Sequence, residues 1–380
     1  MAIDLHDVPE ARQTYAMCLD SVQADWGQLA FVREDLQTND LCLCAITQNA
    51  NALQYVTNQT PEICLKAIKK DGYALRFVEK QTPELCWEAV KKNGWTIEYV
   101  KDQTLELCLE AIKCCCTTLM AIKNQTPELC LEAVKINGSA LEYVKNQTPE
   151  ICLAAIRQNS MALMCVKQQT PEICLEAVKK NGWALEYVTE QTPEICLAAV
   201  KQYGRALRHV HDQTPEICLA AIEQSPTALE YVKEQTPELC LKAVELNGDT
   251  LEYVKDQTPE ICLAALKWVG STLRYVREQT PEICLAAVKR QGDALKYVKN
   301  RTPKICLAAV KQDGLALQYV PEQEQTLPMA IAALRRNPDS REYLADKFRT
   351  PLVYKVSGYK YKPEDLAPVR YSNKMQDRTK

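Results

Sequence analysis

The feature of this sequence that most constrains its fold is a 22-residue segment that returns along almost the whole chain. One copy, from Gln169 to Glu190, reads QTPEICLEAVKKNGWALEYVTE, and the pattern begins again at Gln191 and Gln213. Internal repetition at a period of about 20 to 50 residues is the signature of a stacked-repeat architecture. Positions within a repeat are numbered below from its first glutamine, which is position 1.

The first half of each repeat predicts a short helix. In the copy quoted above, Thr170 is a favourable N-cap, Pro171 suits the first helical position, and Glu172 places negative charge at the positive end of the helix. Apolar residues at positions 5, 6, 7, 9 and 10 then form one broad face, and charged residues at positions 4, 8, 11 and 12 lie opposite. A helix with so wide an apolar face needs neighbours on both sides.

A second, shorter helix is predicted after Asn181 and Gly182, which interrupt the first. We interpret position 13 as the N-cap of this second helix and glycine at position 14 as a residue that permits close approach. Ordering one repeat costs about 1.5 kcal/mol per residue, roughly 30 kcal/mol in all, which its few buried side chains cannot offset alone. The repeats must therefore stack, and the predicted fold is an all-α, right-handed α-solenoid of about fifteen helix-turn-helix repeats.

The repeats divide the chain into three segments. Residues 1–12 precede the first repeat and are expected to cap the N-terminal end, and residues 13–348 are expected to form the solenoid. Residues 349–380 are basic and rich in tyrosine, and they show no helical period. We expect them to form a C-terminal tail or end cap, with an extended or disordered tail favoured.

Composition narrows the classes of function. The net charge is −3, and Lys and Glu alternate along the predicted exposed faces, so there is no basic field for nucleic acid or anionic lipid. The first residues lack the features of a classical signal peptide, and no run of about 18 apolar residues occurs. We therefore expect a cytoplasmic protein, in a host cytosol or in a virion, with no nucleic-acid partner and no membrane insertion.

Cysteine is unusually frequent, with 19 residues, and most of them share one repeat position. Equivalent residues of stacked helices lie roughly 8–10 Å apart, farther than the Cα separation of about 7 Å that a disulfide allows. We expect reduced thiols that pack in the core. Those at position 6 are Cys18, Cys42, Cys64, Cys86, Cys108, Cys130, Cys152, Cys174, Cys196, Cys218, Cys240, Cys262, Cys284 and Cys306.

Two clusters raise the question of metal binding, and neither has a favourable spacing. The run Cys114, Cys115 and Cys116 lacks the loop spacing of a zinc site, and His209 and His211 diverge if they lie on a helix. Nearly every other ionisable side chain is repeated in register, whereas a catalytic site is normally a singular constellation. We therefore predict no metal, no cofactor and no catalytic residue.

A recognition surface is the better hypothesis. Position 15 is the most varied position, and it lies one helical turn from an aromatic column at position 19. A constant core with a variable edge is typical of repeat proteins that bind partners, although these aromatic side chains could also serve only to seal one repeat against the next. We expect specificity to reside at positions 15 and 18. The candidate interaction face consists of Tyr73, Phe77, Trp95, Tyr99, Trp183 and Tyr187.

The segments QTPEICLAAV, QTPELCLEAV and NGWALEYV closely resemble the short repeat of a helical family described as a domain of unknown function (four-one-one-six). The resemblance extends from Gln13 to Lys347. Such repeats are typical of proteins from intracellular bacteria, protists and large DNA viruses. The resemblance implies a helical-repeat fold and brings no catalytic or cofactor residues.

These observations predict a non-enzymatic scaffold for protein–protein interaction, effector-like or viral, that acts in a host cytosol through a protein partner. One alternative is a self-assembling structural component of a virion or filament, in which the ends of the solenoid or the tail bind the next copy. A second alternative is a nucleic-acid reader with one repeat per base, which the acidic balance disfavours.

Overall fold

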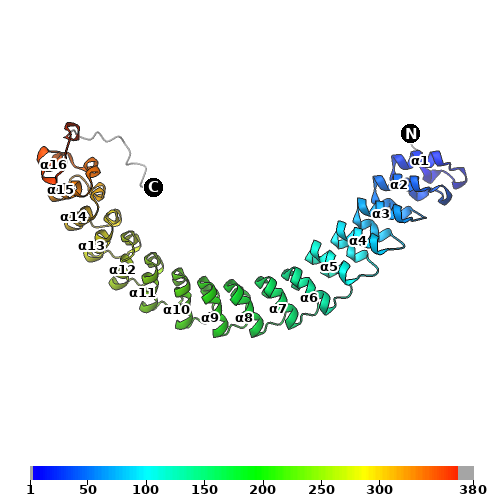
Figure 1. Cartoon of the computed structure of the whole chain (residues 1–380), viewed down its shortest axis with the longest axis horizontal. Coiled ribbons are helices and arrows are strands. Elements are labelled where there is room, and N and C mark those ends of the chain that lie inside the picture. Colours follow the sequence, from blue (N-terminus) through cyan, green and yellow to red (C-terminus); the bar gives the residue numbers. More distant parts are fainter. Residues whose placement is uncertain (1–2, 367–380) are drawn as a thin grey trace. The chain divides into compact units, whose positions relative to one another are not determined.

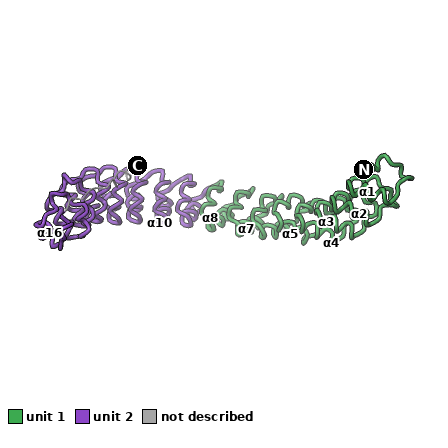
Figure 2. Tube along the Cα trace, turned by 90° about the horizontal axis from the view of Figure 1, so that it is seen from above, with its two compact units in different colours: residues 1–190 green, residues 191–380 purple. Residues whose placement is uncertain are grey.

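The computed structural model describes residues 3–366, and all the regular structure in this range is helical. The chain divides into two compact units, residues 1–190 (unit 1) and residues 191–380 (unit 2), which Figure 2 colours separately. Within each unit, consecutive repeats stack side by side (Figure 1), and the first helix of one repeat contacts the first helix of the next. This confirms the prediction of an all-α solenoid.

The first helix of each repeat is an α-helix, in most repeats of 10 residues. In unit 1 these helices are α1 (Tyr15–Ala24), α2 (Asn39–Gln48), α3 (Pro61–Lys70), α4 (Pro83–Lys92), α5 (Leu105–Cys114), α6 (Pro127–Ile136), α7 (Pro149–Gln158) and α8 (Pro171–Lys180). In unit 2 they are α9 (Pro193–Gln202), α10 (Pro215–Gln224), α11 (Pro237–Leu246), α12 (Pro259–Leu266), α13 (Pro281–Arg290), α14 (Pro303–Gln312) and α15 (Leu327–Arg336), and α16 (Pro351–Ser357) follows.

The second helix of each repeat is a 3₁₀ helix, a detail that the sequence did not reveal. In unit 1 these are η3 (Trp26–Phe31), η5 (Ala50–Tyr55), η6 (Gly72–Phe77), η7 (Gly94–Tyr99), η8 (Cys116–Ala121), η9 (Gly138–Tyr143), η10 (Ser160–Cys165) and η11 (Gly182–Tyr187). In unit 2 they are η12 (Gly204–His209), η13 (Pro226–Tyr231), η14 (Gly248–Tyr253), η15 (Gly270–Tyr275), η16 (Gly292–Tyr297), η17 (Gly314–Tyr319) and η18 (Pro338–Tyr343). The short 3₁₀ helices η1 (Leu5–Asp7), η2 (Glu10–Arg12), η4 (Glu34–Leu36), η19 (Asp346–Phe348) and η20 (Pro363–Leu366) lie elsewhere.

Both helices of a repeat begin at the predicted N-caps. In the repeat that starts at Gln169, the Thr170 hydroxyl accepts a hydrogen bond from the Ile173 N–H at 3.3 Å. The Asn181 side chain accepts one from the Trp183 N–H at 3.1 Å. Each cap satisfies one backbone N–H at the start of its helix. Asn181 has an extended backbone, which confirms its interpretation as an N-cap in this repeat. Tyr203, Ser225 and Gln291 occupy the same position with an extended backbone but without a side-chain cap hydrogen bond.

Glycine at position 14 permits a close approach between repeats. A Cβ atom at Gly204 would lie 2.5 Å from the backbone carbonyl oxygen of Ala221 in the next repeat, and the equivalent distance at Gly138 is 2.6 Å, from Ala155. Both distances are well inside van der Waals contact. The glycine therefore lets the second helix lie directly against the next α-helix, as predicted.

Gly204→Ala is accordingly expected to destabilise the protein by about 1–3 kcal/mol, because the backbone of two packed helices must shift to admit one methyl group. Gly27→Ala is the control, since the nearest atom there would be Asp25 Oδ1 at 3.3 Å, the end of a side chain. Chemical denaturation measures both. Equal stability of the two variants would contradict the close packing at position 14.

Glutamine at position 1 joins three segments of the chain, a role that the sequence did not suggest. The side-chain amide of Gln147 donates to the carbonyl of Leu141 in the preceding repeat at 3.0 Å and to that of Cys165 at 2.9 Å. Its carbonyl oxygen accepts from the Lys167 N–H at 2.9 Å, and the Cys152 thiol lies at 3.9 Å. One side chain thus satisfies backbone groups at both ends of the repeat.

Residues 3–12 cover one end of unit 1. Leu5 is buried, and its N–H donates to the side chain of Gln28 at 2.8 Å. The Ser21 hydroxyl donates to the carbonyl of Ile3 at 2.7 Å. This segment therefore packs on the first repeat; residues 1–2 of the predicted N-terminal cap lie outside the described residues.

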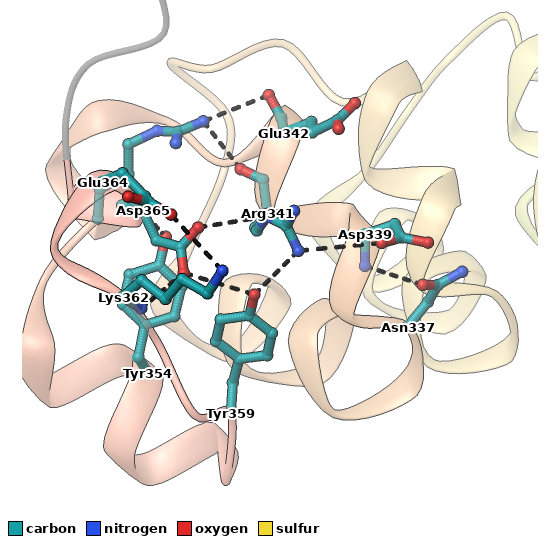
Figure 3. Close-up of polar contacts among 10 residues, drawn as sticks. Asn337, Asp339, Arg341, Glu342, Tyr354, Tyr359, Lys362, Glu364 and Asp365 are labelled. Atoms are coloured by element: carbon teal, nitrogen blue, oxygen red, sulfur yellow. Dashed lines mark hydrogen bonds and ion pairs between the residues drawn. The ribbon is translucent and has the colours of Figure 1, made fainter.

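The C-terminal end of unit 2 carries an additional helix, α16, where we favoured an extended or disordered tail over an end cap. Tyr354 of α16 is fully buried, and its hydroxyl donates to the carbonyl of Asp365 at 2.9 Å. The Asp365 carboxylate lies 3.4 Å from Arg341 Nε, and Arg341 also donates to the Tyr359 hydroxyl at 2.9 Å (Figure 3). A seven-residue helix is too short for its period to stand out in the sequence. Residues 367–380 lie outside the described residues.

Candidate interaction face

The outer side of the second helices is built from positions 15, 18 and 19. In η7, Thr96 and Ile97 point into the core and are completely buried. Trp95 and Tyr99 are half-buried, and Glu98 between them is exposed. The same order of exposure recurs in neighbouring repeats because their second helices have the same register. Adjacent second helices contact each other within unit 1, so these positions form a continuous surface there.

Aromatic side chains on this surface contact one another across the repeat boundary. Tyr73 at position 15 meets Tyr99 at position 19 of the next repeat, with ring centroids 6.1 Å apart in an edge-to-face arrangement. The guanidinium of Arg76 lies 4.5 Å from the centroid of the Phe77 ring. These aromatic residues therefore contribute to packing between repeats, yet each remains half-exposed and available on the surface.

The six aromatic residues of the predicted face do not form one cluster. Tyr73, Phe77, Trp95 and Tyr99 belong to two adjacent repeats of unit 1. Trp183 and Tyr187 are also half-buried, on the second helix of the repeat that begins four repeats after that of Trp95. The structure therefore places all six on the same kind of surface, but other residues must fill the space between the two groups.

Methionines fill that space, and the sequence analysis did not single them out. Met120 and Met164 at position 18 are 60% and 63% exposed. Met161 and Cys165 beside Met164 are half-buried. We call the surface made by positions 15, 18 and 19 of five consecutive repeats the Trp95–Tyr187 face. Its members are Trp95, Glu98, Tyr99, Thr117, Met120, Ala121, Ser139, Glu142, Tyr143, Met161, Met164, Cys165, Trp183, Glu186 and Tyr187.

The charge on the Trp95–Tyr187 face has a single sign. Its exposed charged side chains are Glu98, Glu142 and Glu186, and none of its members is Lys or Arg. None of the ion pairs found within the described part of the chain involves these three carboxylates. Position 18 therefore alternates between a carboxylate and an exposed methionine along the face.

The equivalent surface of unit 2 is different, because several of its charges form ion pairs with one another. Nη2 of Arg205 lies 3.4 Å from Oε2 of Glu230, and Nη2 of Arg274 lies 3.6 Å from Oδ2 of Asp249. Nζ of Lys296 lies 3.4 Å from Oδ2 of Asp293. The guanidinium of Arg205, at position 15, also lies 5.3 Å from the ring centroid of Tyr231. Opposite charges on this surface neutralise each other locally. Exposed methionine at position 18 therefore distinguishes the Trp95–Tyr187 face from the second helices of unit 2.

Lysine at position 21 makes hydrogen bonds between neighbouring repeats. Lys167 Nζ lies 3.2 Å and 3.0 Å from the carbonyl oxygens of Val144 and Lys145 in the preceding repeat. Lys255 contacts Val232 and Lys233 in the same way. These cations satisfy carbonyl groups at the end of a second helix. Their ammonium groups therefore make hydrogen bonds within the fold.

The cysteines fall into two environments. Those at position 6, including Cys64, Cys86, Cys130, Cys152, Cys174 and Cys196, are free and buried. Burial raises the pKa of their thiols, to about 11 for Cys42 and Cys108. Cys114 and Cys115 are exposed, and Cys115 Sγ lies 2.8 Å from the Thr117 hydroxyl. This hydrogen bond, together with one from the Thr117 N–H, lowers the pKa of Cys115.

Thiol labelling at pH 7.5 should therefore occur first at Cys114 and Cys115. A lowered pKa increases the thiolate fraction of Cys115, whereas a raised pKa keeps the buried column protonated. We expect Cys115 to react with iodoacetamide at least tenfold faster than the position-6 cysteines, as measured by peptide mass spectrometry. Denaturation should remove the difference. Rapid native labelling of the column would contradict its burial.

The described residues contain no group of three or more His, Cys, Asp or Glu side chains arranged to hold a metal ion. His209 lies at position 19 of η12, in the aromatic column. In the same range, no helix is both long enough and apolar enough to span a bilayer.

Comparison with known families gives one match. The model of the family described as "Domain of unknown function (DUF4116)" matches residues 60–105, 126–169, 148–192, 170–214, 192–236 and 280–325. These segments together cover more than half of the chain, and each spans about two repeats. Among curated proteins, none is significantly similar in sequence to this chain.

Proposed function

The chain belongs to the DUF4116 family of helical repeats, and from this premise we propose that it is a non-enzymatic scaffold that binds a protein partner through the Trp95–Tyr187 face. The observation that carries the proposal is the exposure of Met120 and Met164 among half-buried aromatic side chains. Contiguous exposed apolar surface is rare in monomeric proteins and often marks a binding site. Tyr, Trp and Met are also enriched in protein interfaces.

The character of these residues favours a protein ligand. Methionine is flexible and polarisable, so it adapts to the shape of an apolar partner. Aromatic side chains supply large contact areas at a low cost in conformational entropy. The carboxylates of Glu98 and Glu142 would repel a phosphate backbone, which weighs against the one-repeat-per-base alternative. We place this activity in a host cytosol, where the reduced cysteine column would persist.

Self-assembly is a second candidate, because α16 exposes apolar side chains on its outer side. Leu352 is 69% exposed and Val356 is 45% exposed, one helical turn apart. Such a pair could contact another copy of the chain. Sedimentation velocity over a hundredfold range of concentration tests this alternative. Self-association that Leu352→Glu abolishes would favour it, whereas a concentration-independent monomer would exclude it.

The proposed scaffold is tested by affinity capture from nuclease-treated host-cell lysate. The bait variant Trp95→Ala, Trp183→Ala removes two tryptophans from the face. The matched control Trp87→Ala, Trp268→Ala removes two tryptophans that lie outside it, on α4 and just after α12. We expect a partner that the wild type and the control retain and the face variant loses by at least tenfold, with circular dichroism unchanged. Equal capture by both variants, or no specific partner at all, would refute the proposal.

A further inference from the structure

Position 18 of the Trp95–Tyr187 face has a chemical pattern that the proposed scaffold does not by itself require. In chain order the column reads Glu98, Met120, Glu142, Met164 and Glu186. All five side chains are exposed, and they come from five consecutive second helices of unit 1. Carboxylates and apolar side chains therefore alternate from repeat to repeat along one line of the surface.

The carboxylates of this column lack basic neighbours on the face. On the second helices of unit 2, some acidic side chains form ion pairs with basic ones, as Glu230 does with Arg205 and Asp249 does with Arg274, although Glu252 at position 18 forms none among the described residues. Beside the column, the Glu142 carboxylate accepts a hydrogen bond from Tyr143 and thereby raises the pKa of that phenol. The three glutamates therefore create a negative potential over an otherwise uncharged surface.

We propose that the partner binds this column through a basic, apolar peptide segment, whose cations meet Glu98, Glu142 and Glu186 and whose apolar side chains pack on Met120 and Met164. This inference rests on the proposed scaffold function and names its ligand. Charge complementarity selects the occupant: three carboxylates without a basic neighbour on the face attract Lys or Arg, whereas an acidic segment or a nucleic acid is repelled.

The spacing of the column defines the pattern of the ligand. Neighbouring packed helices are roughly 8–10 Å apart, so successive glutamates are separated by roughly 16–20 Å. An extended peptide advances about 3.3 Å per residue. An extended segment would therefore carry a cation at about every sixth residue, with an apolar side chain about midway between cations.

Phage display of random 15-residue peptides on the immobilised full-length chain tests this inference. The variant Glu98→Gln, Glu142→Gln, Glu186→Gln removes the three carboxylates of the column. The control variant Glu88→Gln, Glu132→Gln, Glu176→Gln removes the same charge from the same three repeats, but from the α-helices. The ion pairs of Glu132 and Glu176 are on the surface, so their loss has little effect on folding.

We expect the wild type and the control variant to enrich peptides with Lys or Arg at intervals of about six residues and apolar residues between them. The best such peptide should bind the column variant at least tenfold more weakly than the wild type in fluorescence anisotropy, and the control variant within twofold. Binding to the wild type should also weaken as salt is raised from 50 to 500 mM.

Two outcomes would overturn the inference. One is enrichment of peptides without excess positive charge, or with affinities that the column variant does not change. In that case, affinity capture of a partner that the Trp95→Ala, Trp183→Ala variant loses would still support the scaffold. Failure of this inference can therefore be told apart from failure of the proposed function. The other is the absence of any enriched peptide, which would show that the column does not recognise linear segments.

Discussion

Replacing Gln147 with methionine should destabilise unit 1 by about 3 kcal/mol. Methionine has a similar volume but makes none of the three hydrogen bonds that join Gln147 to Leu141, Cys165 and Lys167. Each such bond contributes about 1 kcal/mol, and the backbone groups left behind are partly shielded from water. Urea denaturation followed by circular dichroism measures the change.

Amide hydrogen exchange shows where in the chain Gln147→Met weakens the structure. The Lys167 N–H donates to the Gln147 side chain, so its protection should fall in the Gln147→Met variant. Gln54→Met is the matched control, because Gln54 occupies position 18 and is exposed. We expect no measurable change in stability or exchange for this control. If both variants unfold at the same urea concentration, the glutamine at position 1 does not hold the repeats together.

The second large effect is expected from deletions that either keep or break the 22-residue period of the repeats. Deleting one full repeat, Gln257 to Glu278, should leave a soluble protein with unchanged helicity per residue. The side-chain amide of Gln279, which now bonds to Leu273, would meet the carbonyl of Leu251, because that residue occupies the same position one repeat earlier. Stacked repeats interact only with their neighbours, so the junction reproduces a native interface.

Deleting only the first half of the same repeat, residues 257–267, should abolish stable folding of unit 2. This change removes α12, which packs against both η14 and η15, and leaves α13 as the α-helix against which η15 packs. Leu273 and Val276, which are buried, would then be exposed to water. Limited proteolysis and circular dichroism separate the two deletions. Equal tolerance of both would show that the 22-residue segment is not the structural unit.

Much of the fold could be predicted because its signals are local and repeated. Thr170 and Asn181 cap their helices within three residues, so the pattern of the sequence alone indicates both starts. Cysteine recurs at position 6 of the repeat, on the apolar face of the first helix, and the burial of Cys174 follows from that position. Gly204 was interpreted correctly because only a missing side chain permits such close approach.

Other features depend on distances that the sequence does not contain. Gln147 looks like a polar linker residue until the carbonyl of Cys165, 18 residues later, is brought to its amide. The second helix is 3₁₀ because it is only six residues long and ends at an extended valine such as Val188. Position 18 was expected to carry specificity, but Met120 and Met164 were not singled out, because only their exposure and alignment with Glu142 reveal a surface.

If the second helices of unit 1 form the proposed binding face, site-specific photo-crosslinking from that face should capture the partner. The photo-reactive residue benzoylphenylalanine would replace Met164 on the face or, in the same repeat, Leu153 on α7. After irradiation in host-cell lysate, crosslinked proteins are identified by mass spectrometry. We predict one dominant partner at position 164, competed by the unlabelled wild type, and none at position 153. Crosslinks to the same protein at position 153 alone would contradict the account.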